Sequence, residues 1–174
     1  MTFFIKINQM LKKSIFILFA ISLFTEASIS QVSENSDLFI QLKKMDSLVF
    51  TEGFNKCNLV TLENLIAGDF EFYHDVGGSQ EKKLFLESMK NNICSTPNNK
   101  PIRKLVEGSI EVFPLYNQGL LYGAIQNGIH EFWIQEPNKE LYQTGEAKFS
   151  TTWLLIDGQW KMKNVLSYDH KAAH

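Results

Sequence analysis

Residues 152–170 read TWLLIDGQWKMKNVLSYDH, and they carry the clearest signal for the fold. Aliphatic and aromatic residues fill both of its halves, and the dipeptide Asp157-Gly158 separates them. Asp-Gly between two apolar runs is a strong signal for a tight hairpin turn. The stretch therefore predicts two antiparallel strands, at 141–156 and 159–168, that are joined by this turn.

The pattern of the closing hairpin continues toward the N-terminus as far as Ile102. Turn signals at 117–119 (Asn-Gln-Gly) and 136–139 (Glu-Pro-Asn-Lys) interrupt it. Four consecutive antiparallel strands are therefore predicted, at 102–115, 120–135, 141–156 and 159–168. Strands of this length usually bend in globular proteins. The bends and bulges are expected at glycines inside the strands, namely Gly123, Gly128 and Gly145.

The segment before residue 102 has the periodicity of helices. A first helix is predicted to begin at Asp37 as its cap, with one apolar stripe formed by Leu38, Leu42, Met45 and Val49. A second helix is predicted over residues 59–66. A third is predicted over residues 81–92, with Ser79 as its cap.

Residues 70–74 (Phe-Glu-Phe-Tyr-His) predict a short strand between the second and third helices, and Gly77-Gly78 predicts a turn after it. Helices followed by a long antiparallel meander make an α+β layout. We expect N-terminal helices packed on a strongly curved antiparallel sheet, forming a cone with a pocket at its open end.

The first thirty residues are typical of a secretory signal peptide. Lys12 and Lys13 precede an apolar run over residues 15–24, and small residues, Ser28 and Ser30, follow it. The run is too short to span a bilayer, which takes about 20 residues. We expect cleavage after Ser30 and no stable membrane span afterwards. The mature protein would then be periplasmic or secreted, with one domain over residues 31–174.

The composition is that of an ordinary globular protein. The 174 residues include 44% hydrophobic and 21% charged side chains, and the formal net charge is −2. Such a balance gives no electrostatic basis for nucleic-acid binding, so no nucleic-acid partner is expected.

In an exported protein the two cysteines, Cys57 and Cys94, can form a disulfide, because disulfides persist outside the reducing cytosol. We expect them to form a disulfide worth about 3–4 kcal/mol by the chain-entropy argument. The alternative is two free, buried thiols.

Two pieces of the sequence resemble a known superfamily. They are the stretch Asp69 to Asp75 with Gly77-Gly78 after it, and the closing hairpin 152–161 with its continuation over 165–170. Both are similar to the nuclear-transport-factor-2-like superfamily, which includes ketosteroid isomerase, scytalone dehydratase and polyketide cyclases. Within it, the chain most resembles the bacterial branch labelled domain of unknown function 4440. The resemblance implies the cone fold, which the superfamily uses for catalysis, ligand binding and dimerisation.

Three histidines of the mature chain are candidates for a site near the mouth of the cone: His74, His130 and His170. Side chains two residues apart share a face of a strand. By this parity Tyr122 shares a face with His130, Tyr168 shares one with His170, and Trp153 lies on an aromatic face between them. The predicted pocket is therefore lined by His74, Tyr122, His130, Trp153, Tyr168 and His170, with Asp75 near the mouth.

Three functions remain open from the sequence. The favoured one is binding of a small apolar or aromatic molecule in the pocket. The second is an acid–base enzyme of isomerase or dehydratase type, with His130, Asp75 and His170 as catalytic residues. The third is a non-catalytic interaction module, and a homodimer is expected in each case.

No cofactor or metal is predicted. The histidines have no local ligand spacing that would indicate zinc. Gly77-Gly78 lacks the surrounding pattern of a phosphate-binding loop, and no G-x-S-x-G sequence marks a hydrolase elbow.

Overall fold

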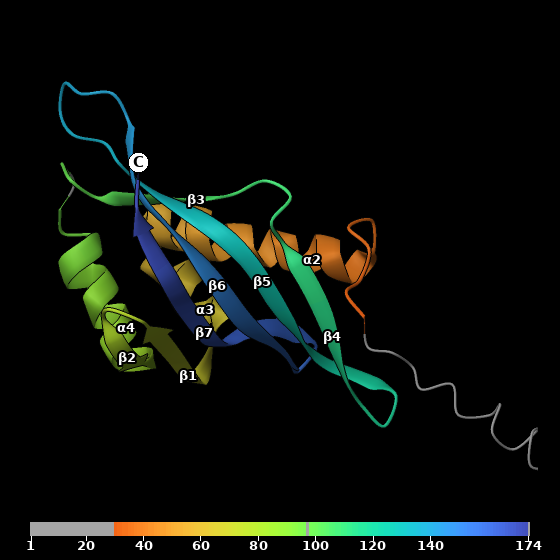
Figure 1. Cartoon of the computed structure of the whole chain (residues 1–174). Helices are drawn as coiled ribbons and strands as arrows, with labels where there is room; N and C mark the ends of the chain where they lie inside the picture. The colour runs from red at the N-terminus through yellow and green to blue at the C-terminus, as the bar shows by residue number, and fades with distance from the viewer. Residues whose placement is uncertain (1–29, 97, 174) are drawn as a thin grey trace, which may run out of the picture.

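The computed structural model describes residues 30–96 and 98–173 of the chain. The predicted signal peptide lies outside the described residues, apart from Ser30. Figure 1 shows the helices packed against one face of a curved, unclosed sheet of seven strands. The predicted α+β class, with N-terminal helices on a strongly curved and mostly antiparallel sheet, is confirmed.

All three predicted helical regions are present. Helix α2 (Asp37–Ser47) runs on into the π-helical segment η1 (Leu48–Asn55), and the short helix α3 (Leu59–Leu65) follows. Helix α4 (Lys82–Ser88) likewise runs on into the π-helical segment η2 (Met89–Ile93).

The helix caps differ from the predicted ones. Ser36, not Asp37, caps α2, because its Oγ accepts the Phe39 N–H at 3.2 Å. Ser79 caps no helix and lies in a short strand, while Glu81 precedes α4 without a side-chain cap. Serine and aspartate are both good caps and lie side by side here, and the prediction of Asp37 was wrong by one residue.

Seven strands form the sheet, in the order β2-β1-β7-β6-β5-β3, with β4 also paired to β5. Their bounds are β1 (Ile66–His74), β2 (Gly78–Glu81), β3 (Pro101–Leu105), β4 (Glu111–Asn117), β5 (Leu120–Ile134), β6 (Tyr142–Ile156) and β7 (Gln159–Ala172). The β1–β7 pair is parallel and all others are antiparallel. This parallel pair brings the end of β1 beside the end of β7, with His74 opposite Ser167.

The predicted hairpins are confirmed, and their turns have the expected backbone. Both residues of Gln118-Gly119 and of Asp157-Gly158 have positive φ, as tight hairpin turns of the primed types require. The predicted single strand 102–115 is wrong, however. It is divided into β3 and β4 by a loop that contains Gly108 at φ +73°, and the two strands pair with opposite halves of β5.

Two bulges in β7 decide which of its side chains face the helices. Lys163 is an extra residue between the pairs Thr152–Asn164 and Trp153–Met162. Asp169, at φ +59°, is an extra residue between Tyr168 and Lys171. Each bulge reverses the alternation of the strand.

Gly128 does not bulge, contrary to expectation. The register of β5 with β6 runs unbroken through it. A Cβ atom at residue 128 would lie 2.6 Å from Cζ of Phe149, so glycine is needed here to let the phenylalanine ring lie across the strand. The alternation of β5 is therefore kept, and His130 points toward the helices.

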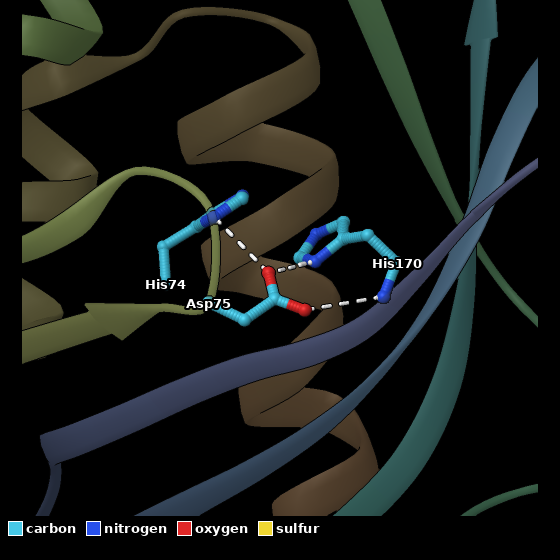
Figure 2. A group of neighbouring side chains, drawn as sticks. All are labelled: His74, Asp75 and His170. Atoms are coloured by element: carbon cyan, nitrogen blue, oxygen red, sulfur yellow. Dashed lines mark hydrogen bonds and ion pairs between the residues drawn. The ribbon is translucent and has the colours of Figure 1, made fainter.

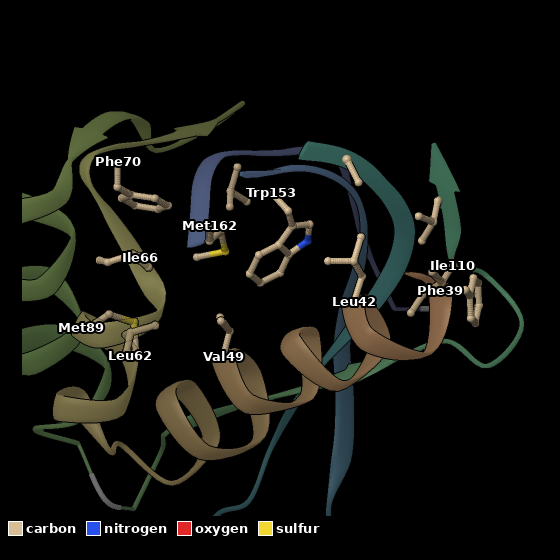
Figure 3. Packing of buried hydrophobic residues seen from close by; sticks show 13 residues of the cluster. Phe39, Leu42, Val49, Leu62, Ile66, Phe70, Met89, Ile110, Trp153 and Met162 are labelled. Carbon is tan, nitrogen blue, oxygen red and sulfur yellow. The ribbon is translucent and has the colours of Figure 1, made fainter. Parts of the chain in front are cut away.

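The narrow end of the cone is filled by its own side chains. Figure 3 shows Trp153 on the sheet between Leu42 of α2 and Met162 of β7. All three are at most 1% exposed, and the Trp153 indole donates to Oε1 of Gln126 at 2.7 Å. The cavity of the cone lies toward the other end, where α4 packs against β1.

A disulfide joins the ends of the two helical regions. Cys57 follows η1 and Cys94 follows η2, and the predicted bond between them is present. It ties the α4–η2 segment to the rest of the helical layer. Among the residues that the structure describes, no helix has the length and apolar character needed to cross a membrane.

Candidate functional site

A cavity of about 330 Å³ lies between the helical layer and the sheet at the wide end of the cone. Its walls are mainly aromatic, with six phenylalanines at positions 50, 54, 70, 72, 85 and 132. Its polar groups include His74, His130 and Ser167, which come from three different strands and lie close together. The cavity is thus an apolar chamber with one polar patch.

Asp75, His170 and Ser167 form a chain of hydrogen bonds beside the cavity. Oδ1 of Asp75 lies 2.5 Å from Nδ1 of His170, and Nε2 of His170 lies 3.2 Å from Oγ of Ser167. Two backbone bonds hold the group together: the Asp75 N–H donates to the Ser167 carbonyl at 3.1 Å, and the His170 N–H donates to Oδ2 of Asp75 at 3.3 Å. Figure 2 shows Asp75 reaching from the end of β1 to His170 on β7.

This chain of hydrogen bonds continues into the protein interior through His130. Nε2 of His130 lies 3.4 Å from Oγ of Ser167, and its Nδ1 accepts a hydrogen bond from Nε of Arg103 at 3.4 Å. Arg103 also donates two hydrogen bonds to Asp46 of α2, at 2.7 and 2.9 Å. Arg103 and Asp46 are almost completely buried, so the polar chain runs from the pocket mouth to the core.

The partners fix where each hydrogen of the chain lies. Arginine can only donate, so Nδ1 of His130 is an acceptor and the neutral ring carries its hydrogen on Nε2. That Nε2–H points to Ser167, whose own hydroxyl hydrogen is then directed at Nε2 of His170. His170 in turn donates its Nδ1–H to the Asp75 carboxylate. All hydrogen bonds of the chain therefore point outward, from Arg103 to Asp75.

The charge state of His130 agrees with this assignment. Burial and the neighbouring Arg103 cation lower the pKa of His130 to about 3, so the ring is neutral near pH 7. Phe149 stacks on it at 5.1 Å and Phe132 meets it edge-on at 4.7 Å, which explains the desolvation.

His74 stacks on His170 but is held by the backbone. The two ring centroids are 4.1 Å apart. Nδ1 of His74 accepts the N–H groups of Val76 and Gly77 at 3.1 and 3.0 Å, so it is the unprotonated nitrogen and Nε2 carries the hydrogen. Burial and then the charge of His170 lower the pKa of His74, although Asp75 opposes this shift.

The cluster of His74, Asp75 and His170 has potential metal-ligand atoms within 4.8 Å of one another. The lone pair of His74 Nδ1 already accepts two backbone hydrogen bonds. The Nδ1 of His170 is bonded to Asp75. The cluster is thus satisfied by its own hydrogen bonds.

The structure brings four of the seven predicted site residues together. His74 and His130 line the cavity, while His170 and Asp75 stand beside it and contact Ser167 or His74. The other three, Tyr122, Trp153 and Tyr168, do not line it.

Each of these three misplacements has a physical reason. Tyr122 is the extra residue of a bulge in β5 opposite β4 and is 45% exposed. The bulge at Lys163 turns Tyr168 outward, where it is 39% exposed. Trp153 faces the helices as predicted, but it fills the narrow end of the cone.

Sequence reasoning missed Ser167, Arg103 and Asp46. Ser167 faces inward because of the bulge at Lys163, and no glycine or other turn residue at that position indicates the bulge in the sequence. Asp46 had a usable signal, because it lies four residues after Leu42 and three before Val49 on the buried face of α2. A charge at such a position requires a buried partner, which here is Arg103.

The low pKa of His130 predicts a pH dependence of stability. In the unfolded chain a histidine titrates near pH 6.5, so below that pH the unfolded state binds a proton that the folded state does not. The contribution of His130 is therefore complete above about pH 6.5 and is lost by up to about 1.4 kcal/mol per pH unit as the pH falls. Urea unfolding between about pH 6.5 and 4.5 should show a flatter decline for His130→Gln than for the wild type. Equal slopes would contradict the buried neutral state.

Comparisons with known proteins place the fold. No protein-family model matches the sequence, and no curated protein matches it. Solved structures do match. Aln2 from a Streptomyces species superposes with a TM-score of 0.63 at 5% identity, over 76% of this chain and 91% of that one.

Two further matches carry the name of the fold. A nuclear transport factor 2-like superfamily protein from Salmonella enterica gives a TM-score of 0.58 at 14% identity, over 78% of this chain and 90% of that one. A nuclear transport factor 2-like protein from Cytophaga hutchinsonii gives a TM-score of 0.56 at 14% identity, over 79% of this chain and 99% of that one. At these identities the likeness concerns the fold. The chain therefore has the nuclear-transport-factor-2-like fold.

Proposed function

We propose that this is an exported protein that binds a small apolar or aromatic molecule in the cavity of the cone. The observation that carries the proposal is the cavity of about 330 Å³ with its six phenylalanines. A volume of this order, apolar walls and a few convergent polar groups are typical of small-molecule sites.

The polar patch specifies what one end of the ligand offers. The Nε2–H of His74 is a donor, and the Ser167 hydroxyl, to which His130 donates its Nε2–H, lies beside it. A ligand with one hydrogen-bond acceptor, such as a carbonyl or ether oxygen, would match this patch. The rest of the molecule would lie among the phenylalanine rings.

Export is supported by two independent features. The first thirty residues have the pattern of a signal peptide, and the Cys57–Cys94 disulfide is compatible with an oxidising compartment such as the periplasm or the extracellular space. In that setting the ligand would be met outside the cytoplasm.

Binding can be tested with a neutral aromatic fluorophore, N-phenylnaphthylamine. Ser88 lines the cavity from α4, so Ser88→Trp should fill it and weaken binding at least about tenfold, or about 1.4 kcal/mol. Glu87→Trp, on the exposed side of the same helix, is the matched control and should bind like the wild type. Fluorescence titration measures both affinities. Equal affinities of the two variants would place the fluorophore outside the cavity.

A homodimer through the outer face of the sheet is the second part of the proposal. That face exposes Tyr73 of β1 opposite Leu166 of β7, at 41% and 43%, with Tyr168 nearby at 39%. Exposed apolar side chains gathered on one sheet face are typical of an interface. Such an interface would leave the cavity free, because the cavity lies on the opposite face.

Light scattering coupled to size exclusion tests the dimer. We expect twice the chain mass for the mature wild type and the single mass for Leu166→Lys. Val60→Lys, at a 71% exposed position on α3, is the control and should stay dimeric. A wild type that elutes as a monomer at tens of micromolar would exclude this interface.

A further inference from the structure

The hydrogen-bond chain Asp75–His170–Ser167 has the order and connectivity of a carboxylate, an imidazole and a nucleophilic hydroxyl. The carboxylate holds the ring by Nδ1 at 2.5 Å, and the opposite ring nitrogen is 3.2 Å from the hydroxyl oxygen. In this arrangement the ring can take the hydroxyl proton while the carboxylate stabilises the resulting imidazolium.

Each member of the group is positioned by a separate feature of the fold. Asp75 follows β1 and is fixed to β7 by its backbone bond to Ser167. Ser167 faces the cavity because of the bulge at Lys163. The second bulge, at Asp169, turns His170 back to the side of Ser167, so that residues three apart in one strand meet.

The buried half of the chain sets the direction of the Ser167 hydroxyl. Arg103 forces the hydrogen of His130 onto Nε2, and that hydrogen points to the Ser167 oxygen. Since this position is taken, the hydroxyl hydrogen is left to His170. The serine is thus held with its proton toward the base and its oxygen at the cavity wall.

We propose that Ser167 is a nucleophile activated by His170 and Asp75, and that the protein hydrolyses small carboxylic esters with an apolar acyl group. The proposal rests on the proposed function, because the acyl group is what the phenylalanine-lined cavity would bind. It assigns the cavity a reaction in addition to a ligand class.

The reaction balances with water as the only co-reactant. Oγ of Ser167 attacks the ester carbonyl carbon while its proton passes to Nε2 of His170. The C–O bond to the alcohol then breaks and the departing oxygen takes that proton, which leaves an acyl-serine. Water, deprotonated by His170, attacks the acyl carbon, and the proton returns to Ser167 as the carboxylic acid leaves.

Two side-chain donors can stabilise the oxyanion that forms during attack. The Nε2–H of His130 is bonded to the Ser167 oxygen at 3.4 Å before attack, and it can turn to the adjacent oxyanion once that oxygen has bonded to the acyl carbon. His74, with its hydrogen on Nε2, lines the same polar patch. Side-chain N–H groups serve this purpose in known oxyanion holes. His130 stays a neutral donor because its other nitrogen is bonded to Arg103.

A fluorophosphonate that carries an alkyl chain tests the nucleophile directly, because it modifies activated serines covalently. Incubated with the mature wild-type protein, it should label the peptide that contains Ser167, as read by mass spectrometry. The same protein should hydrolyse p-nitrophenyl butyrate. Ser167→Ala should abolish both signals, and His170→Ala should lower the labelling rate at least about 100-fold.

Two further variants separate chemistry from folding. Asp75→Asn preserves the shape of the carboxylate and should still lower the labelling rate at least about tenfold. Ser79→Ala, an exposed serine of β2, should label and hydrolyse like the wild type. Binding of N-phenylnaphthylamine, measured on every variant, shows that the cavity is intact.

The outcomes distinguish the two proposals. If the fluorophore binds but Ser167 is not labelled, Ser167 is not an activated nucleophile, and the proposed binding function is unaffected. Equal rates of Ser167 labelling in the wild type, His170→Ala and Asp75→Asn would also overturn the proposed nucleophile, because Ser167 would then not be activated by His170 and Asp75. Absence of fluorophore binding in the wild type would contradict the binding function and this inference together.

Discussion

The ion pair between Asp46 and Arg103 joins the helical layer to the sheet in a place where water does not reach. Asp46 lies on α2 and Arg103 on β3, and each side chain is 3% exposed. Burial raises the pKa of Asp46, while the charge of the Arg103 guanidinium and its hydrogen bonds oppose that rise. Removing either partner would leave a buried charge unpaired, which costs about 3–5 kcal/mol. The guanidinium carbon of Arg103 also lies 3.9 Å from the centroid of the Phe50 ring, and this contact further restricts the side chain.

This pair also determines the chemistry of the cavity wall. Because both terminal nitrogens of Arg103 donate to Asp46, its Nε is left to donate to His130. That bond fixes the tautomer of His130, which in turn sets the hydrogen bonds of Ser167 and His170. The polarity of a site near the surface is therefore controlled from the core, by an ion pair that lies outside the cavity.

Turn chemistry made the sheet predictable from the sequence. Asp157-Gly158 and Gln118-Gly119 require positive φ, and local signals of this kind do not depend on tertiary context. The short strand β2 and the division of the predicted strand 102–115 were not predicted, because they depend on pairing with β1 and β5.

The candidate site was predictable only where strand alternation is uninterrupted. His130 was placed correctly because β5 is regular through Gly128. In β7 the bulges at Lys163 and Asp169 reverse the alternation twice. As a result His170 lies on the predicted face but beside the cavity, whereas Tyr168 points outward and Ser167 was missed. A bulge without glycine leaves no mark in the sequence that periodicity can detect.

The site depends on a chain of hydrogen bonds with one fixed direction, from Arg103 to Asp75. Long-range nitrogen–proton correlation spectra of the histidine rings, recorded on the mature protein at pH 7, test it most directly. We expect a neutral His130 with its hydrogen on Nε2, in agreement with its pKa of about 3, and a His170 with its hydrogen on Nδ1. A doubly protonated His130, or one with its hydrogen on Nδ1, would contradict it.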